Sequence, residues 1–239
     1  MSDRKACVGP EEVGVLMDLL SHDILNNNQA TLSYLELIHS SDVDGRTKEF
    51  AEKAASQLRT SSVLLDGVRR FVSSSRDGRI PTSPVDLRET LADVGREVSS
   101  LFPHKKVTVD LSGVAAGTRV IGANCVSDLF TNLIMNLVQL DPAQKVRVEV
   151  KVRPARRKAG TEVRVEVSSP NAVLPQGVGD DLFAHASPGD TSKMARVSGA
   201  VFASSVARAL GGGVTSRVLD PKRNRGCAFE VTLEGVRPR

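Results

Sequence analysis

The chain has 239 residues, of which 40% are apolar and 25% are charged, with one Tyr, seven Phe and no Trp. This composition excludes a disordered or collagen-like chain and suffices for one large domain or two smaller ones. The formal net charge of +4 is too small for the footprint of a nucleic-acid-binding protein. The shortage of Tyr and Trp also removes the stacking platform that such proteins use.

The sequence carries no sign of a membrane, a disulfide framework or a metal centre. No apolar run approaches the roughly 18 residues that span a bilayer, and the first residues lack the apolar stretch of a signal peptide. We therefore expect a cytoplasmic protein with no membrane partner. The cysteines, Cys7, Cys125 and Cys227, lie far apart without CxxC or Cys/His spacing, so we expect buried thiols and no metal.

The first part of the chain is expected to form two long helices, from about Pro10 to Ser40 and from about Arg46 to Val72, joined by a turn at 41–45. On the first helix, one apolar stripe comprises Val13, Leu16, Met17, Leu20, Ile24, Asn27, Thr31, Tyr34, Leu35 and Ile38. Further apolar residues flank it, namely Leu19, Leu25, Leu32 and Leu37. Because two helices alone bury little apolar surface, this excess predicts a homodimer that forms a four-helix bundle.

A segment rich in Ser, Gly and Pro at 76–84 predicts a linker between a helical domain, 1–75, and a second domain, 85–239. In the second domain the patterns predict helices at 85–101, 124–140 and 197–210 and strands at 106–111, 118–122, 146–152, 162–167, 214–219 and 228–233. Helices against a mostly antiparallel sheet make an α/β sandwich. The whole chain is therefore expected to be of the α+β class.

Two basic segments, Lys151–Lys158 and Lys222–Arg225, are expected at hairpin turns. A solvated turn is the simplest interpretation. The alternative is docking to an acidic partner or, less favoured because aromatic residues are few, to a nucleic acid.

The stretch SHDILNNNQ at 21–29 carries the clearest chemistry. His22 and Asn26 lie one turn apart on one helix face, away from the apolar stripe, and Asp23 is beside His22. A neutral imidazole can accept a phosphoryl group, a carboxylate can hold its other N–H, and an amide can position a water. The alternative is a histidine that is merely solvated, which is the interpretation given to His39, His104 and His185.

SHDILNNNQ followed by YLELI resembles the phosphoacceptor segment, the H-box, of histidine kinases. The second domain resembles the ATP-binding domain of that family: PVDL opens its first helix, DLFTNLIMNL is similar to the N-box, DDLFAHASPGDTSK to the F-box and lid, and RVSGAVFASSVARALGGGV to the last helix. The resemblance implies that His22 is the phosphoacceptor, Asp23 its acid–base neighbour and Asn26 the residue associated with phosphatase activity. Asn132 and Asn136 would be relics of the metal-facing asparagines.

The nucleotide motifs depart from the family pattern. Where the first glycine box has an adenine-reading Asp and two glycines, this chain has SSPNAV at 168–173. The second glycine box keeps only Gly199, and Gln139 stands where a basic residue usually follows the N-box. An unpaired donor on the base costs about 1–3 kcal/mol, and side chains replace glycines where phosphates must approach the backbone. We therefore expect no tightly bound cofactor.

These observations predict a histidine phosphotransferase of a two-component phosphorelay, resembling the dimeric phosphotransferases whose kinase-like second domain does not use ATP. His22 would carry phosphoryl groups between the aspartates of response-regulator receiver domains, and the receiver would supply Mg²⁺. Two alternatives stay open: an ATP-dependent histidine kinase with divergent nucleotide loops, and a phosphatase or scaffold that only docks a receiver.

Overall fold

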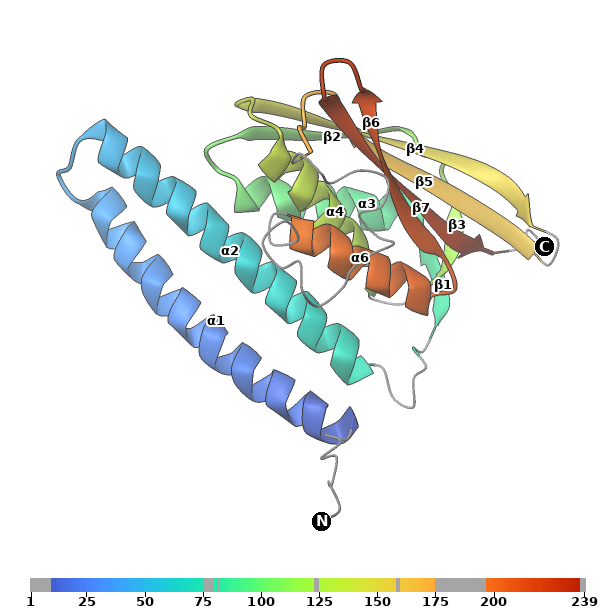
Figure 1. The fold of residues 1–239 in the computed structure, drawn as a ribbon, viewed down its shortest axis with the longest axis horizontal. Helices are drawn as coiled ribbons and strands as arrows, with labels where there is room; N and C mark the ends of the chain where they lie inside the picture. The colour runs from blue at the N-terminus through green and yellow to red at the C-terminus, as the bar shows by residue number, and fades with distance from the viewer. Residues whose placement is uncertain are drawn as a thin grey trace, which may run out of the picture. The chain divides into compact units, whose positions relative to one another are not determined.

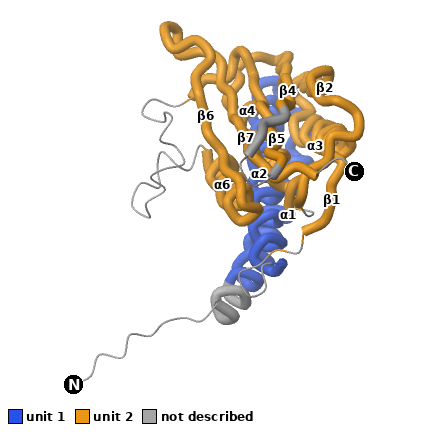
Figure 2. The backbone as a smooth tube through the Cα atoms, turned by 90° about the vertical axis from the view of Figure 1, so that its right-hand side faces the viewer, with its two compact units in different colours: residues 1–76 blue, residues 77–239 orange. Residues whose placement is uncertain are grey.

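The computed structural model describes residues 10–74, 80, 82–122, 125–157, 160–174 and 197–236. The chain divides into two compact units, Met1–Arg76 and Asp77–Arg239 (Figure 2). No helix among the described residues is both long enough and apolar enough to cross a membrane.

The first unit is a hairpin of two helices, α1 (Pro10–Ser40) and α2 (Gly45–Ser74), which run antiparallel (Figure 1). Asp44 caps α2, because its Oδ1 accepts the backbone N–H groups of Arg46 and Thr47 at 2.9 and 3.0 Å. Thr47 Oγ1 also donates to Asp44 Oδ2 at 2.6 Å, and these bonds lower the pKa of the Asp44 carboxyl. The predicted pair of helices and the turn between them are confirmed.

The face of α1 that packs within the hairpin differs from the predicted stripe. Asn28 Nδ2 donates to Ser62 Oγ of α2 at 3.1 Å, Leu32 is buried and Leu25 is half-buried. Most described stripe residues are instead exposed, among them Leu20 (58%), Ile24 (40%), Tyr34 (68%) and Ile38 (38%). The helix carries two apolar faces, and its periodicity alone does not say which of them meets α2.

The second unit is a sheet covered on one face by three helices, α3 (Leu87–Leu101), α4 (Cys125–Leu140) and α6 (Ser198–Ala209) (Figure 1). Its strands are β1 (Ser83–Asp86), β2 (Lys106–Gly113), β3 (Arg119–Gly122), β4 (Lys145–Arg157), β5 (Gly160–Ser169), β6 (Gly213–Asp220) and β7 (Arg225–Gly235). The seven strands follow the order β1-β3-β7-β5-β4-β2, and β6 pairs with β7. Only β2 and β4 run parallel among these pairs. The predicted α+β class and α/β sandwich are confirmed.

The core of this unit lies between α4 and the sheet. Every side chain of α4 from Leu129 to Val138 is buried. On β4 and β5 the valines alternate with charged residues, so that Val148 and Val165 face the core while Arg147 and Arg164 face solvent. This alternation is why the period-2 pattern located both strands.

Two predicted boundaries are wrong. The end of the expected linker, at 83–84, belongs to β1, and the helix begins only after Asp86, whose Oδ1 accepts the N–H of Glu89 at 3.1 Å. The basic segment predicted as a turn is strand over 151–157, because β4 stays paired with β5 as far as Arg157 opposite Gly160, and 158 lies outside the described residues. A strand with one solvated face accommodates charged residues, so charge does not mark a turn. Of the basic segment Lys222–Arg225, the first three residues lie in the turn between β6 and β7, and Arg225 begins β7.

Candidate functional site

The three residues of the H-box come together on the exposed side of α1. The side chains of His22 and Asp23 are 70% and 81% exposed, and His22 Nδ1 lies 3.3 Å from Asp23 Oδ1. Asn26 Nδ2 is 3.3 Å from Nδ1 and 3.4 Å from Nε2 of the same imidazole. The histidine, its carboxylate neighbour and its amide neighbour therefore form one solvent-exposed cluster.

The contact with Asp23 is compatible with the tautomer of His22 that carries its proton on Nδ1. A proton on Nδ1 can be donated to the Asp23 carboxylate, which leaves the Nε2 lone pair as the nucleophile. Asn26 lies beside the ring, where its amide can reach a group or a water held near Nε2. The cluster thus has the parts required to accept a phosphoryl group on imidazole.

The packing of α1 sets the orientation of this cluster. Ser21 is 1% exposed, and with Leu25 and Asn28 it lies on the side of α1 that packs within the hairpin. His22 and Asn26 follow Ser21 and Leu25 by one residue each. At about 100° per residue they therefore project away from the packed side.

In the second unit, the N-box asparagines are buried rather than on a polar surface. Asn132 and Asn136 are 1% and 3% exposed. Their amide groups donate to the carbonyls of Asp128 and Asn132 at 2.8 and 3.0 Å. Their Oδ1 atoms have no hydrogen-bond partner. Amide oxygens are among the ligands that a divalent cation accepts, so these two are candidate acceptors at the position of the metal-facing pair.

Helix α6 lies directly on these asparagines at Gly199. A Cβ atom at that position would come within 2.4 Å of Asn136 Nδ2 and 3.1 Å of Asn132 Oδ1. The one glycine kept from the second glycine box thus permits close contact between α4 and α6.

Among the described residues, no group of three or more His, Cys, Asp and Glu side chains could hold a metal.

The end of β5, where the resemblance places the adenine-reading Asp, carries a different set of contacts. Ser169 Oγ donates to Asp141 Oδ2 at 2.7 Å, and both residues are fully buried. The other Asp141 oxygen accepts the N–H of Ala143 at 2.8 Å. Asn171 Oδ1 accepts from Arg225 Nη2 at 2.5 Å. These polar groups at the end of β5 are therefore engaged with one another.

Within the described residues, the family pattern for binding a nucleotide is incomplete. The stretch 168–173, SSPNAV, contains neither the Asp nor the two glycines of the first glycine box. At the position of the metal-facing pair, the described residues offer the amide oxygens of Asn132 and Asn136. The stretch similar to the F-box and lid, 180–193, lies outside the described residues, as do 195 and 196 of the second glycine box.

The comparisons with known proteins bear on the fold. No family model matches the chain, and no curated protein sequence matches it. Among solved structures, full-length ShkA in complex with AMPPNP matches with a TM-score of 0.53 and 16% identity, over 93% of this chain and 46% of that chain. The mycobacterial sensor histidine kinase MprB matches with a TM-score of 0.48 and 20% identity, over 66% of this chain and all of that one.

The fold is histidine kinase-like. The match to ShkA extends over both units, although this chain spans less than half of the length of ShkA. At this level of identity the comparison establishes the fold, and the chemistry rests on the residues described above.

The structure also places the remaining residues that the sequence singled out. The thiols of Cys125 and Cys227 are buried and are not joined in a disulfide, and burial raises the pKa of Cys227 to about 12. His39 is exposed, whereas His104 is half-buried with its ring edge against Phe102 and is not merely solvated. Cys7 and His185 lie outside the described residues.

Two contacts escaped the sequence analysis, the pair formed by Ser169 and Asp141 and the pair formed by Arg225 and Asn171. Each joins residues far apart in the chain, so no local spacing signals it.

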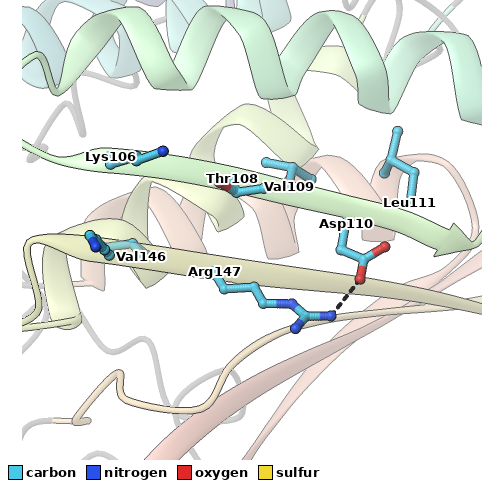
Figure 3. A pocket seen from close by; sticks show the side chains of 8 residues that line it. Lys106, Thr108, Val109, Asp110, Leu111, Val146 and Arg147 are labelled. Carbon is cyan, nitrogen blue, oxygen red and sulfur yellow. Dashed lines mark hydrogen bonds and ion pairs between the residues drawn. The ribbon is translucent and has the colours of Figure 1, made fainter.

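A shallow groove of about 540 Å³ lies between β2 and β4 (Figure 3). Arg147 Nη2 donates to Asp110 Oδ2 there, at 2.7 Å. The groove contains none of the predicted site residues.

Proposed function

We propose that this protein is a histidine phosphotransferase that moves phosphoryl groups between receiver-domain aspartates through His22 without using ATP. The observation that carries the proposal is the exposed cluster of His22, Asp23 and Asn26. It is supported by the end of β5, where the resemblance places the adenine-reading Asp and where Ser169 instead bonds to Asp141.

The transfer step follows from the geometry of the cluster. The Nε2 lone pair of His22 attacks the phosphorus of an aspartyl phosphate, the bond from phosphorus to the carboxyl oxygen breaks, and the carboxylate of the receiver leaves. The imidazole gains positive character, which Asp23 offsets by holding the Nδ1 proton. The reverse reaction delivers the group to a second receiver. Mg²⁺ held by the receiver would neutralise charge on the phosphoryl oxygens.

The partners in this proposal are receiver domains and a second copy of the chain. Leu20, Ile24 and Ile38 of α1 are exposed large apolar residues, and so is Phe50 of α2, which is 54% exposed. Apolar side chains repeated on the outer face of a two-helix hairpin favour burial against a like hairpin. A homodimeric four-helix bundle would cover them.

An ATP-dependent histidine kinase remains the main alternative. The unpartnered oxygens of Asn132 and Asn136 favour it, since they leave two acceptors at the position of the metal-facing pair. It requires nucleotide binding, whereas the proposal requires transfer when nucleotide is absent.

A phosphatase that only docks a receiver is the second alternative, and the position of Asn26 beside the imidazole favours it. In that case Asn26→Ala slows dephosphorylation of the receiver while His22 never carries phosphate. The proposal instead requires a phosphorylated histidine.

The test is transfer from a receiver domain carrying labelled phosphate to the purified, nucleotide-free protein. Wild type should acquire acid-labile, base-stable label that His22→Ala loses. His39→Ala is the matched control, because His39 is a second exposed histidine on the same helix, and it should keep the label. Absence of label on wild type with several receivers would overturn the proposal.

A further inference from the structure

We propose that a cavity at the β6–β7 turn is a docking site for an acidic segment of a partner protein, one that presents a carboxylate beside an apolar side chain. The cavity lies wholly within the second unit. This site is separate from His22 and does not depend on phosphoryl transfer.

The cavity has a volume of about 420 Å³ and lies among three segments of the chain. The loop after α4 contributes Pro142, the loop after β5 contributes Asn171 and Val173, and the β6–β7 turn contributes Arg223 and Arg225. Its lining therefore combines apolar groups with two guanidinium groups. Val173 is 41% exposed, so an apolar group has a surface to cover there.

The cationic side of the cavity is held in place. Arg225 Nη2 donates to Asn171 Oδ1 at 2.5 Å, which fixes the guanidinium across the loop that replaces the first glycine box. Asp220 pairs with Arg225 in the strand register, and Asn224 adopts the left-handed conformation with φ 46°. A pre-positioned guanidinium loses less entropy when it binds a carboxylate.

The charges of the turn are not balanced. Lys222, Arg223 and Arg225 face one acid, Asp220, whose Oδ2 is 3.9 Å from Arg223 Nε. Among the residues that the structure describes, Lys222 and Arg225 form no ion pair. The N–H groups of the Arg225 guanidinium that do not bond to Asn171 are therefore available to a carboxylate, which they can bind in a bidentate manner.

The lining favours a protein segment over a nucleic acid. No aromatic side chain lines the cavity, so bases have no surface on which to stack. Pro142 and Val173 instead suit an aliphatic side chain next to the acid. The occupant inferred from this complementarity is an extended segment in which Glu or Asp is near Leu, Ile or Val.

The experiment measures fluorescence anisotropy of a labelled peptide of alternating Glu and Leu with the full chain. Wild type should bind it with an affinity that falls as salt rises. Arg223→Glu combined with Arg225→Glu should weaken binding about 10-fold or more. The matched control is Lys106→Glu with Lys145→Glu, which reverses two charges in the groove between β2 and β4 and should change the affinity less than about 2-fold.

Two further variants distinguish loss of the binding groups from a change in the structure of the β6–β7 turn. Arg223→Glu alone leaves the bond between Arg225 and Asn171 intact and should still weaken binding, and Val173→Ser should weaken it without any change of charge. Equal affinities for wild type and the arginine variants, or no binding by wild type, would contradict the proposal. Preferential binding of single-stranded oligothymidine over the peptide would overturn it in favour of a nucleic-acid site.

Discussion

At the scale of single residues, the proposed reactivity of the cluster of His22, Asp23 and Asn26 depends on the groups beside the imidazole. His22 is exposed, so nothing in its burial hinders a receiver, and its selectivity must come from the groups beside it. Asp23 is the group that can hold the Nδ1 proton while Nε2 reacts. An isolated exposed histidine lacks that partner.

We therefore expect Asp23→Asn to slow phosphoryl transfer to His22 by about 100-fold, within the range of general acid–base effects. The amide cannot offset the charge that the imidazole gains, although its size is unchanged. The measurement is the initial rate of label transfer from a phosphorylated receiver. Asp42→Asn, a change at an exposed position in the α1–α2 turn, should leave the rate unaltered, and equal rates for both variants would remove the role given to Asp23.

Asp110 in the second unit predicts a dependence of stability on pH. The backbone N–H and the hydroxyl of Ser112, and then the Arg147 guanidinium, lower the pKa of the Asp110 carboxyl to about 2 from an ordinary value of 3.8. A lowered folded-state pKa adds stability above the unfolded-state value, and this stability is lost as the pH falls through the folded-state pKa.

Asp110→Asn should therefore be less stable than wild type at about pH 6, and the difference should shrink between about pH 4 and pH 2. Urea unfolding of the two proteins at several pH values measures this difference. A difference that stays constant over the whole range would show that the carboxylate contacts contribute nothing.

At the scale of elements, the contact between α4 and α6 depends on one glycine. Gly199→Ala should lower the free energy of unfolding by about 1–3 kcal/mol, because the new Cβ overlaps the Asn136 amide. Asn136→Ala removes the obstructing atom, so the double variant should be more stable than the sum of the single changes implies. Gly213→Ala is the control, since its Cβ would meet only Thr232 Oγ1, at 3.7 Å. Additive effects in urea unfolding would contradict this packing.

The same elements show what sequence reasoning could and could not reach. Period-2 valines located β4 and β5, and the helical periodicity located α1 and α2, because both signals are local. The prediction of which side of α1 packs against α2 is wrong. Leu25 and Leu32, on the packed side, are as apolar as the stripe that is exposed, so the sequence does not distinguish the two sides. The H-box residues were brought together as predicted, because a spacing of one turn places them on one face. The pairing of Ser169 with Asp141 depends on how β5 and the end of α4 meet, which no local pattern encodes.

At the scale of the whole molecule, the account requires a dimer built on the exposed face of α1. Leu20→Glu combined with Ile24→Glu should convert the dimer to a monomer, because buried glutamates would lack partners in the bundle. Gln29→Glu is the control: Gln29 is exposed and lies about 180° around the helix from Leu20. Light scattering after size-exclusion chromatography gives the mass of each variant. A monomeric wild type would refute the bundle.

The most direct measurement compares two phosphoryl donors for His22 in the presence of Mg²⁺. Wild type and His22→Ala are incubated either with a receiver carrying labelled phosphate or with γ-labelled ATP, and acid-labile, base-stable label is counted. The account predicts label on wild type from the receiver alone and none on His22→Ala from either donor. Label from ATP on wild type but not on His22→Ala would contradict it and identify an ATP-dependent histidine kinase.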